Sequence, residues 1–166
     1  VFFLTAGGPI ETGENGGNSL GSKDYDFIFE VPTDPVKVTP NLDETTRSEA
    51  VVTPNGGSLS AIGADGTAFH LEIPAGALVA DTLIRMTPLR TVEGMPFGKS
   101  PLAVQLEPEG LQFYETAVLS IVPAQPIPVD QQLFFTYSGS GEDLVLATPV
   151  VDSAELKIQI FHFSGY

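Results

Sequence analysis

Short apolar segments separated by turn residues recur through most of this chain, and their spacing is the feature that most restricts its fold. The runs are rich in β-branched and aromatic side chains, and Gly, Pro, Asn and Asp lie between them. They predict strands at residues 50–52, 57–62, 68–73, 82–88, 102–106, 117–122, 132–137, 144–147 and 155–163. The one helical turn that we expect lies at residues 75–78. This pattern predicts an all-β fold, an antiparallel β-sandwich.

The N-terminal third follows a different pattern. Residues 1–22 are rich in Gly and Asn, and we expect them to form an extended Gly-rich N-terminal arm. Residues 23–49 predict one strand at 25–31, followed by a Pro-rich connection with a short extended piece at 36–38. The expected organisation is therefore an arm at 1–22, a strand and connection at 23–49, and a sandwich at 50–166.

Charge excludes two classes of partner. The chain has 7 Lys and Arg against 21 Asp and Glu, a formal net charge of −14. Such a chain repels nucleic acid phosphates and anionic lipid surfaces.

No apolar run approaches the roughly 18 residues of a spanning helix, so we expect no membrane insertion of this chain. The absence of Cys removes disulfides, thiolate metal sites and cysteine nucleophiles from consideration.

Six motifs occur in a fixed order between residue 55 and the end of the chain. They are Gly56-Gly57-x-Leu59, Asp65-Gly66-Thr67, Leu71-x-Ile73-Pro74-Ala75-Gly76-Ala77-Leu78, Asp81-Thr82-x-Ile84, Leu106-x-Pro108-x-Gly110-Leu111-x-Phe113 and Phe161-His162-Phe163-Ser164-Gly165-Tyr166. In this order they resemble the ZU-five domain, the β-sandwich of ankyrins and netrin receptors, in the form that occurs in many bacterial cell-surface proteins. The resemblance covers residues 50–166. It implies an extracellular or cell-surface location.

The turn residues of these motifs also have a direct physical interpretation. Glycines supply positive φ at hairpin turns, and a proline ends a strand because it cannot donate to the ladder. We therefore interpret these residues as structural turns and not as an active site: Gly56, Gly57, Asp65, Gly66, Pro74, Gly76, Pro108 and Gly110.

The tripeptide His162-Phe163-Ser164 is the one candidate for chemistry. In some eukaryotic relatives of the ZU-five family it cleaves itself, which would make Ser164 the nucleophile, His162 the base and Phe163–Ser164 the scissile bond. In the structural alternative, His162 and Ser164 share one face of the last strand while Phe161 and Phe163 fill the core. We favour the structural alternative, so we expect no enzyme and keep self-cleavage as the second hypothesis.

Metal and sugar binding have weaker support. Asp24-x-Asp26 and Glu142-Asp143 could supply oxygen ligands to calcium, but no calcium-loop pattern accompanies them. We therefore expect no metal and no cofactor. Sugar-binding proteins often use exposed aromatic platforms, whereas most Phe residues here occur in strand-like alternation that indicates core packing. A carbohydrate- or calcium-binding accessory module is thus a third hypothesis.

The N-terminus predicts an interaction. Val1-Phe2-Phe3-Leu4 is apolar and favours β structure, and a spacer of about 14 residues follows, with a reach on the order of 45 Å. This arrangement is typical of strand donation, in which one subunit completes the sheet of the next. Alternatively, the segment adds an edge strand to its own sandwich. We expect a non-enzymatic structural or adhesive module that self-associates or binds another surface protein, in its sharper form as a filament subunit.

Overall fold

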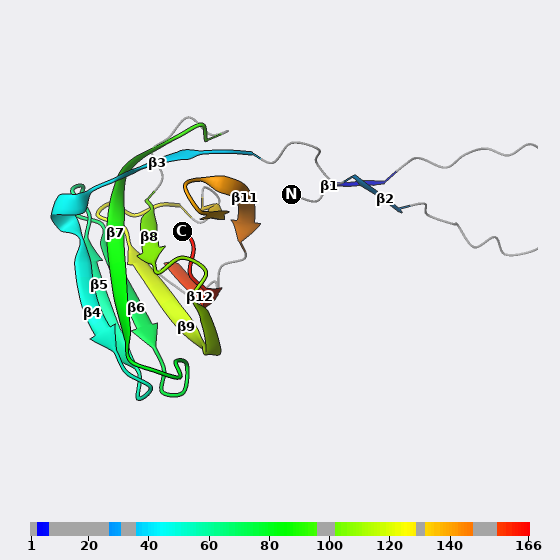
Figure 1. Ribbon diagram of the computed structural model, residues 1–166. Coiled ribbons are helices and arrows are strands. Elements are labelled where there is room, and N and C mark those ends of the chain that lie inside the picture. The colour runs from blue at the N-terminus through cyan, green and yellow to red at the C-terminus, as the bar shows by residue number, and fades with distance from the viewer. Residues whose placement is uncertain (1–2, 7–26, 31–35, 96–101, 129–131, 148–155) are drawn as a thin grey trace, which may run out of the picture. The chain divides into compact units, whose positions relative to one another are not determined.

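The computed structural model describes residues 3–6, 27–30, 36–95, 102–128, 132–147 and 156–166 (Figure 1). The chain divides into two compact units, Val1–Asp34 and Pro35–Tyr166. Within the described ranges the regular structure is β, apart from one 3-10 turn, η1 (Glu44–Thr46). The strands are antiparallel and pack as sheets against each other, which confirms the expected all-β sandwich.

The first unit contains a two-stranded antiparallel sheet. Its strands are β1 (Phe3–Ala6) and β2 (Phe27–Glu30), and Phe3 pairs with Glu30 while Ala6 pairs with Phe27. The strand expected at 25–31 is therefore present in its central part. Val1, Phe2 and most of the Gly-rich arm lie outside the described residues.

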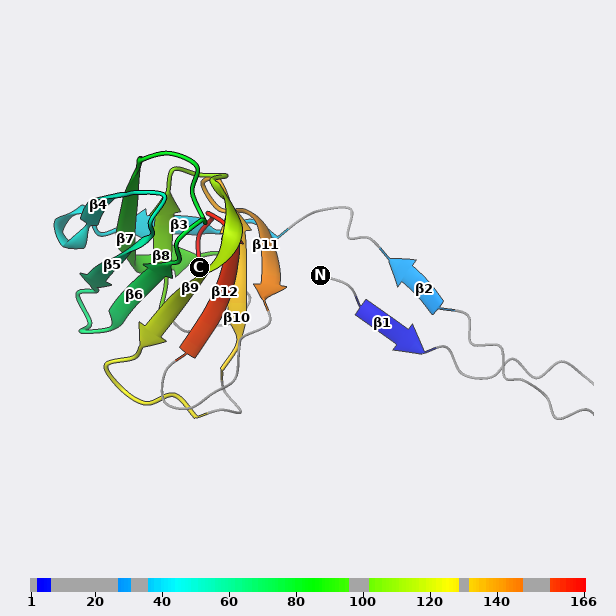
Figure 2. The ribbon, with the colours of Figure 1, turned by 90° about the horizontal axis from the view of Figure 1, so that it is seen from below.

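The first sheet of the second unit contains β5 (Gly57–Ile62), β6 (Ala68–Ile73), β9 (Gln112–Val122) and β12 (Leu156–His162). Its order is β12-β9-β6-β5, and every neighbouring pair is antiparallel (Figure 2). Alternate residues of each strand point into the core, as the period of two requires. On β6, for example, Phe69, Leu71 and Ile73 are buried.

The second sheet is built on the long strand β7 (Thr82–Glu93). Its first half pairs with β4 (Ser48–Val52) and β8 (Val104–Glu107), and its second half pairs with β3 (Thr39–Leu42). The sequence predicts that this strand ends at Pro88, but β7 continues because β3 extends the ladder beyond the proline. The Pro88 carbonyl accepts a hydrogen bond from the Asp43 N–H at 2.8 Å.

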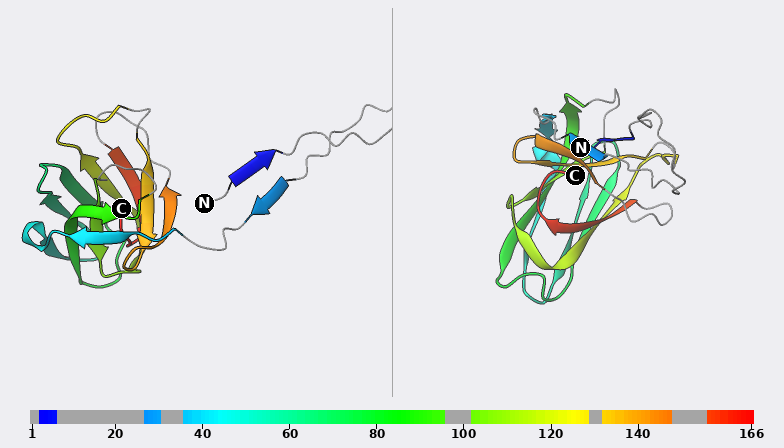
Figure 3. Two further views of the ribbon diagram at one scale, coloured as in Figure 1. Left: turned by 90° about the horizontal axis from the view of Figure 1, so that it is seen from above. Right: turned by 90° about the vertical axis from the view of Figure 1, so that its right-hand side faces the viewer.

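The last three residues cross from the first sheet to the second and bond to strands on both sides. On one side Tyr166 exchanges two backbone hydrogen bonds with Val104 of β8 (2.6 and 2.9 Å). On the other side Gly165 exchanges two with Tyr137 of β10 (2.9 and 3.1 Å). Strand β10 (Phe134–Ser138) forms a hairpin with β11 (Glu142–Ala147). We call Ser164–Tyr166 the C-terminal tail; Figure 3 shows this end of the chain among the strands.

The hairpin also bonds to the segment that leads into β3. The Leu144 N–H donates to the Val36 carbonyl (3.1 Å), and the Val38 N–H donates to the Gly141 carbonyl (2.8 Å). Backbone hydrogen bonds therefore form a closed circuit that runs through β3, β7, β8, the tail, β10 and β11 and returns to the segment before β3. Residues of this circuit form a small second core, which consists of Val38, Tyr137 and Leu144. It is separate from the main core between the two sheets.

Local turns differ from expectation in two places. Residues 75–78 form a hydrogen-bonded turn, in which the Ala77 N–H donates to the Pro74 carbonyl at 3.3 Å, and not a helical turn. The short helical element occurs instead at Glu44–Thr46, where the Asp43 side chain accepts from the Thr45 N–H at 3.2 Å. Asp is a preferred N-cap residue, so this signal was present in the sequence.

Gly165 allows the tail to lie under an aromatic ring, and this generates the first prediction. A Cβ atom at this position would overlap the Tyr137 ring. We expect Gly165→Ala to lower the free energy of unfolding by about 1–3 kcal/mol, because the ring or the tail must move. Urea unfolding at neutral pH measures the loss. Gly57→Ala is the control, since Gly57 also lacks a positive φ and a Cβ there would come no nearer than 3.3 Å, to the Val52 side chain; equal losses in the two variants would refute the role of the ring.

Candidate functional site

The His162-Phe163-Ser164 segment lies where the chain leaves β12 for the tail. The expected alternation is wrong: Phe161 is 61% exposed, whereas Phe163 and Ser164 are both buried, at 1% and 3%. His162 is exposed. The cause is a register irregularity between Ile160 and His162, which interrupts the period of two. Beyond it, strands β8 and β10 cover the tail on both sides, so successive residues are buried.

The carbonyl oxygen of Phe163 faces two nitrogen atoms. It accepts a hydrogen bond from the Gly110 N–H at 3.2 Å, and His162 Nδ1 lies 3.5 Å away. The Phe163 ring is fixed by an edge-to-face contact with Phe113, with ring centroids 5.0 Å apart. The Ser164 hydroxyl is buried without a hydrogen-bond partner. The structure therefore places two polar groups at the carbonyl, but it does not place the imidazole on the serine hydroxyl.

Two phenols lie next to this segment. The Tyr166 hydroxyl donates to the His162 carbonyl at 2.7 Å, and the Tyr137 hydroxyl donates to Gln105 Oε1 at 2.8 Å. Burial raises the pKa of Tyr137 far above its usual range. Burial also raises the pKa of Tyr166, and the Ser164 side chain partly opposes that shift. Both phenols are therefore neutral hydrogen-bond donors at neutral pH. No signal in the sequence identified either interaction.

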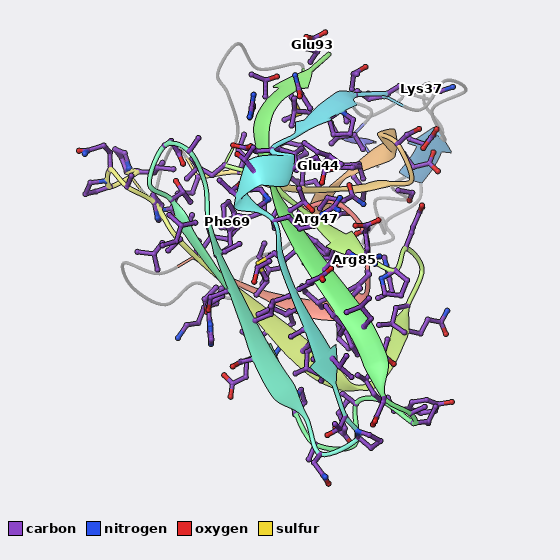
Figure 4. All side chains as sticks on the ribbon, turned by 60° about the vertical axis from the view of Figure 1, so that its left-hand side comes forward. Lys37, Glu44, Arg47, Phe69, Arg85 and Glu93 are labelled. Atoms are coloured by element: carbon purple, nitrogen blue, oxygen red, sulfur yellow. The ribbon has the colours of Figure 1, made fainter. Side chains whose placement is uncertain are left out.

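A polar cluster joins η1 to β7, and Figure 4 shows two of its members, Glu44 and Arg47, at η1. The Asp43 side chain is only 3% exposed, and Arg90 Nη2 donates to its Oδ1 at 2.9 Å. Arg47 forms an ion pair with Glu44 and donates to the buried Thr87 hydroxyl at 3.2 Å. The Arg90 guanidinium and the Thr45 hydroxyl hold the pKa of Asp43 at about 2. The cluster anchors η1 against β7, which is a structural role.

A cavity of about 120 Å³ lies between the two cores. Apolar side chains of both cores dominate its wall, among them Val92, Ile121, Phe135 and Ile158. None of the described residues that line it is Asp, Glu, Lys, Arg or His. The described wall therefore carries no acid–base pair for catalysis.

The expected turn residues lie at strand ends and loops. Positive φ occurs at Gly56, Gly66, Gly76 and Gly110, whereas Gly57 begins β5 and shows none. Gly56 is tightly constrained, because a Cβ there would lie 2.6 Å from the Ile73 carbonyl oxygen. Asp65 accepts from the Thr67 N–H and hydroxyl at 3.0 and 2.8 Å, and the turn residues Pro74 and Pro108 follow β6 and β8 directly.

Of the candidate metal ligands, the structure describes Glu142 and Asp143. Both oxygens of Glu142 accept hydrogen bonds from Ser140, at 2.9 and 3.1 Å. Asp24 and Asp26 lie outside the described residues. Among the residues that the structure describes, no three His, Asp or Glu side chains gather in a way that could hold a metal ion.

Comparison with known proteins does not assign the chain to a family. No protein-family model matches the chain, and no curated protein has a significantly similar sequence. Within the described residues, none of the helical structure is long and apolar enough to cross a membrane.

The Asp43–Arg90 pair generates a pH prediction. The pKa of Asp43 is about 2 in the folded chain and about 3.9 in an unfolded one, so the ionised carboxylate favours folding. This contribution is complete above about pH 4 and disappears as the pH falls through about 2. We therefore expect Asp43→Asn to be less stable than wild type at pH 6 and the difference to shrink between pH 4 and pH 2. Urea unfolding across this range measures it, with Asp81→Asn as control, because Asp81 is exposed and lies outside the cluster. A pH-independent difference would contradict the pKa argument.

Proposed function

We propose that the chain is a non-enzymatic structural or adhesive module of a secreted or cell-surface protein. In its sharper form, it is a subunit of an extracellular filament that assembles through N-terminal strand donation. The resemblance to bacterial ZU-five domains supports the surface location. The net charge of −14 supports a role in which the module stays soluble at high local concentration.

The observation that carries this proposal is the two-stranded sheet of β1 and β2. A single two-stranded sheet is marginally stable in water, and further strands or a packing surface are needed for independent stability. The two strands read FLTA and FIFE, a composition that favours β pairing over solvation. Since neither strand has a second pairing partner among the described residues, both outer edges are available to a strand of another subunit.

The second unit has the properties of a subunit body. Its described residues hold a continuous core that includes Leu71, Ile84, Met86, Leu119 and Ile160, all at most 1% exposed. Its C-terminal tail is bonded on both sides. A body of this kind withstands the loss of the N-terminal unit, so assembly and folding are separable by experiment.

Oligomeric state tests the assembly proposal. We expect the intact chain to form large oligomers or filaments in light scattering and negative-stain images, and a chain lacking residues 1–34 to be a folded monomer. Leu4→Pro removes a backbone donor from β1 and should abolish assembly. Leu4→Val is the matched control, because it retains the donor and the β preference. A monomeric intact chain would refute assembly through the arm.

Self-cleavage before Ser164 is the second candidate, and the geometry at the Phe163 carbonyl favours it. In this reaction the Ser164 Oγ attacks the Phe163 carbonyl carbon, and its proton passes to His162. The oxyanion forms where the Gly110 N–H donates at 3.2 Å. The C–N bond then breaks, the amine of Ser164 takes the proton, and an ester remains. Water hydrolyses the ester to a Phe163 carboxylate and a free Ser164 hydroxyl. The imidazole must first reach the serine hydroxyl.

Intact mass under denaturing conditions tests this candidate. If cleavage occurs, the purified chain separates into residues 1–163 and the tripeptide 164–166, and Ser164→Ala retains the full mass. His162→Gln should slow cleavage at least about tenfold, the contribution of a general base. A wild-type chain of full mass after prolonged incubation at neutral pH would eliminate self-cleavage and leave the structural role.

A further inference from the structure

The first sheet presents one side to the core and the other away from it, and we call the second side the outer face. The register of β5, β6, β9 and β12 places outward residues in rows across the sheet. One row consists of Ser60, His70, Ser120 and Lys157, and the next of Ser58, Glu72, Val118 and Gln159. Adjacent strands lie about 4.8 Å apart, so the members of each row are neighbours across the sheet.

The outer face is nearly neutral in a strongly acidic chain. Its two central rows contain one acid, Glu72, and one base, Lys157, whereas the whole chain carries a formal charge of −14. The remaining side chains of these rows are mostly hydroxyl, amide and imidazole groups. One of them is already paired, since Ser60 Oγ lies 2.8 Å from His70 Nδ1. These two rows therefore offer hydrogen-bond donors and acceptors, and their formal charges sum to zero.

Two exposed aromatic side chains lie at one end of this face. Tyr114 is 76% exposed and Phe161 is 61% exposed, and they are the two aromatic residues among the exposed large hydrophobics of the described chain. Ile160 pairs with Ala117 and His162 with Gln112, so Phe161 lies opposite the β9 stretch that contains Tyr114. Both side chains point outward, because their neighbours Ile160 and Phe113 pack in the core.

Uncharged polar residues lie beside the two exposed rings. Gln112 and Gln159 are exposed, and Thr116 is partly exposed on the same part of the sheet. Singly exposed apolar side chains are common on soluble proteins, but two exposed aromatic rings on one part of a sheet provide faces on which a ligand can stack. Uncharged amide and hydroxyl groups around such rings fix the orientation of a polar ligand.

We propose that the outer face binds an uncharged glycan chain, with the Tyr114 and Phe161 rings against the apolar faces of the sugars. The hydroxyls of a glycan match the amide and hydroxyl groups of the face, and its lack of charge matches the near neutrality of the two central rows. An anionic ligand would be repelled by the chain as a whole. This inference deepens the proposed adhesive role and rests on it.

The test is an NMR titration of the isotope-labelled full-length chain carrying Leu4→Pro, which we expect not to assemble, with four uncharged β-linked hexasaccharides, of glucose, xylose, mannose and N-acetylglucosamine. We expect at least one to shift backbone amides of β9 and β12 around Tyr114 and Phe161. Tyr114→Ala and Phe161→Ala should each weaken binding about tenfold, because each removes a stacking ring. Val51→Ala is the matched control: it is also 61% exposed but lies on β4 of the other sheet.

Each outcome decides the proposal. No amide shift with any of the four sugars at roughly 5 mM would overturn it, and so would equal weakening by Val51→Ala. If Phe161→Ala instead abolishes a concentration-dependent self-association in the absence of sugar, the face is an interface between copies and the glycan proposal fails. Assembly through β1 is measured separately by Leu4→Pro, so failure of glycan binding and failure of the filament model are distinguishable.

Discussion

The backbone hydrogen bonds of the C-terminal tail join the β10–β11 hairpin to β8 of the second sheet. Tyr166 bonds to Val104 and Gly165 bonds to Tyr137, so three residues connect β8 with β10. Without them the β10–β11 hairpin would keep the two backbone bonds that Val36 and Val38 make, the Tyr137–Gln105 bond and the packing of Phe134 in the main core. The Tyr137 ring, which forms part of the small second core, packs on Gly165. The closed circuit and its core therefore both depend on the last residues of the chain.

This arrangement changes what self-cleavage would accomplish. A break between Phe163 and Ser164 would leave the tail attached through its bonds to β8 and β10, and the Tyr166 ring would remain largely buried. Cleavage would therefore weaken the fold through chain entropy rather than remove a strand at once. The structural role and self-cleavage thus involve the same three residues, His162, Phe163 and Ser164. They differ in one requirement, because only self-cleavage needs a contact between the imidazole and the serine hydroxyl.

The sequence predicted what depends on local pattern. Alternation and turn residues located the strands of the sandwich, because burial on one face of a sheet imposes a period of two. The continuation of β7 past Pro88 was not predictable, since it depends on pairing with β3, about 50 residues earlier. The exposure of Phe161 was missed for a similar reason, because the irregularity opposite β9 has no signature in β12 itself. The site at the Phe163 carbonyl likewise depends on Gly110, a residue far away in the chain.

The distribution of charge bears on both proposals, assembly through β1 and glycan binding by the outer face. A chain with 21 acidic residues that keeps two rows of an exposed sheet nearly neutral has its repulsive charge elsewhere on its surface. Repulsion between those acidic regions opposes non-specific association, while the neutral face still tolerates close approach by an uncharged partner. Strand pairing through β1 uses backbone groups, whereas the outer face uses side chains, so neither contact consumes the groups that the other needs. The two proposed contacts are therefore compatible, and the proposals require no competition between assembly and glycan binding.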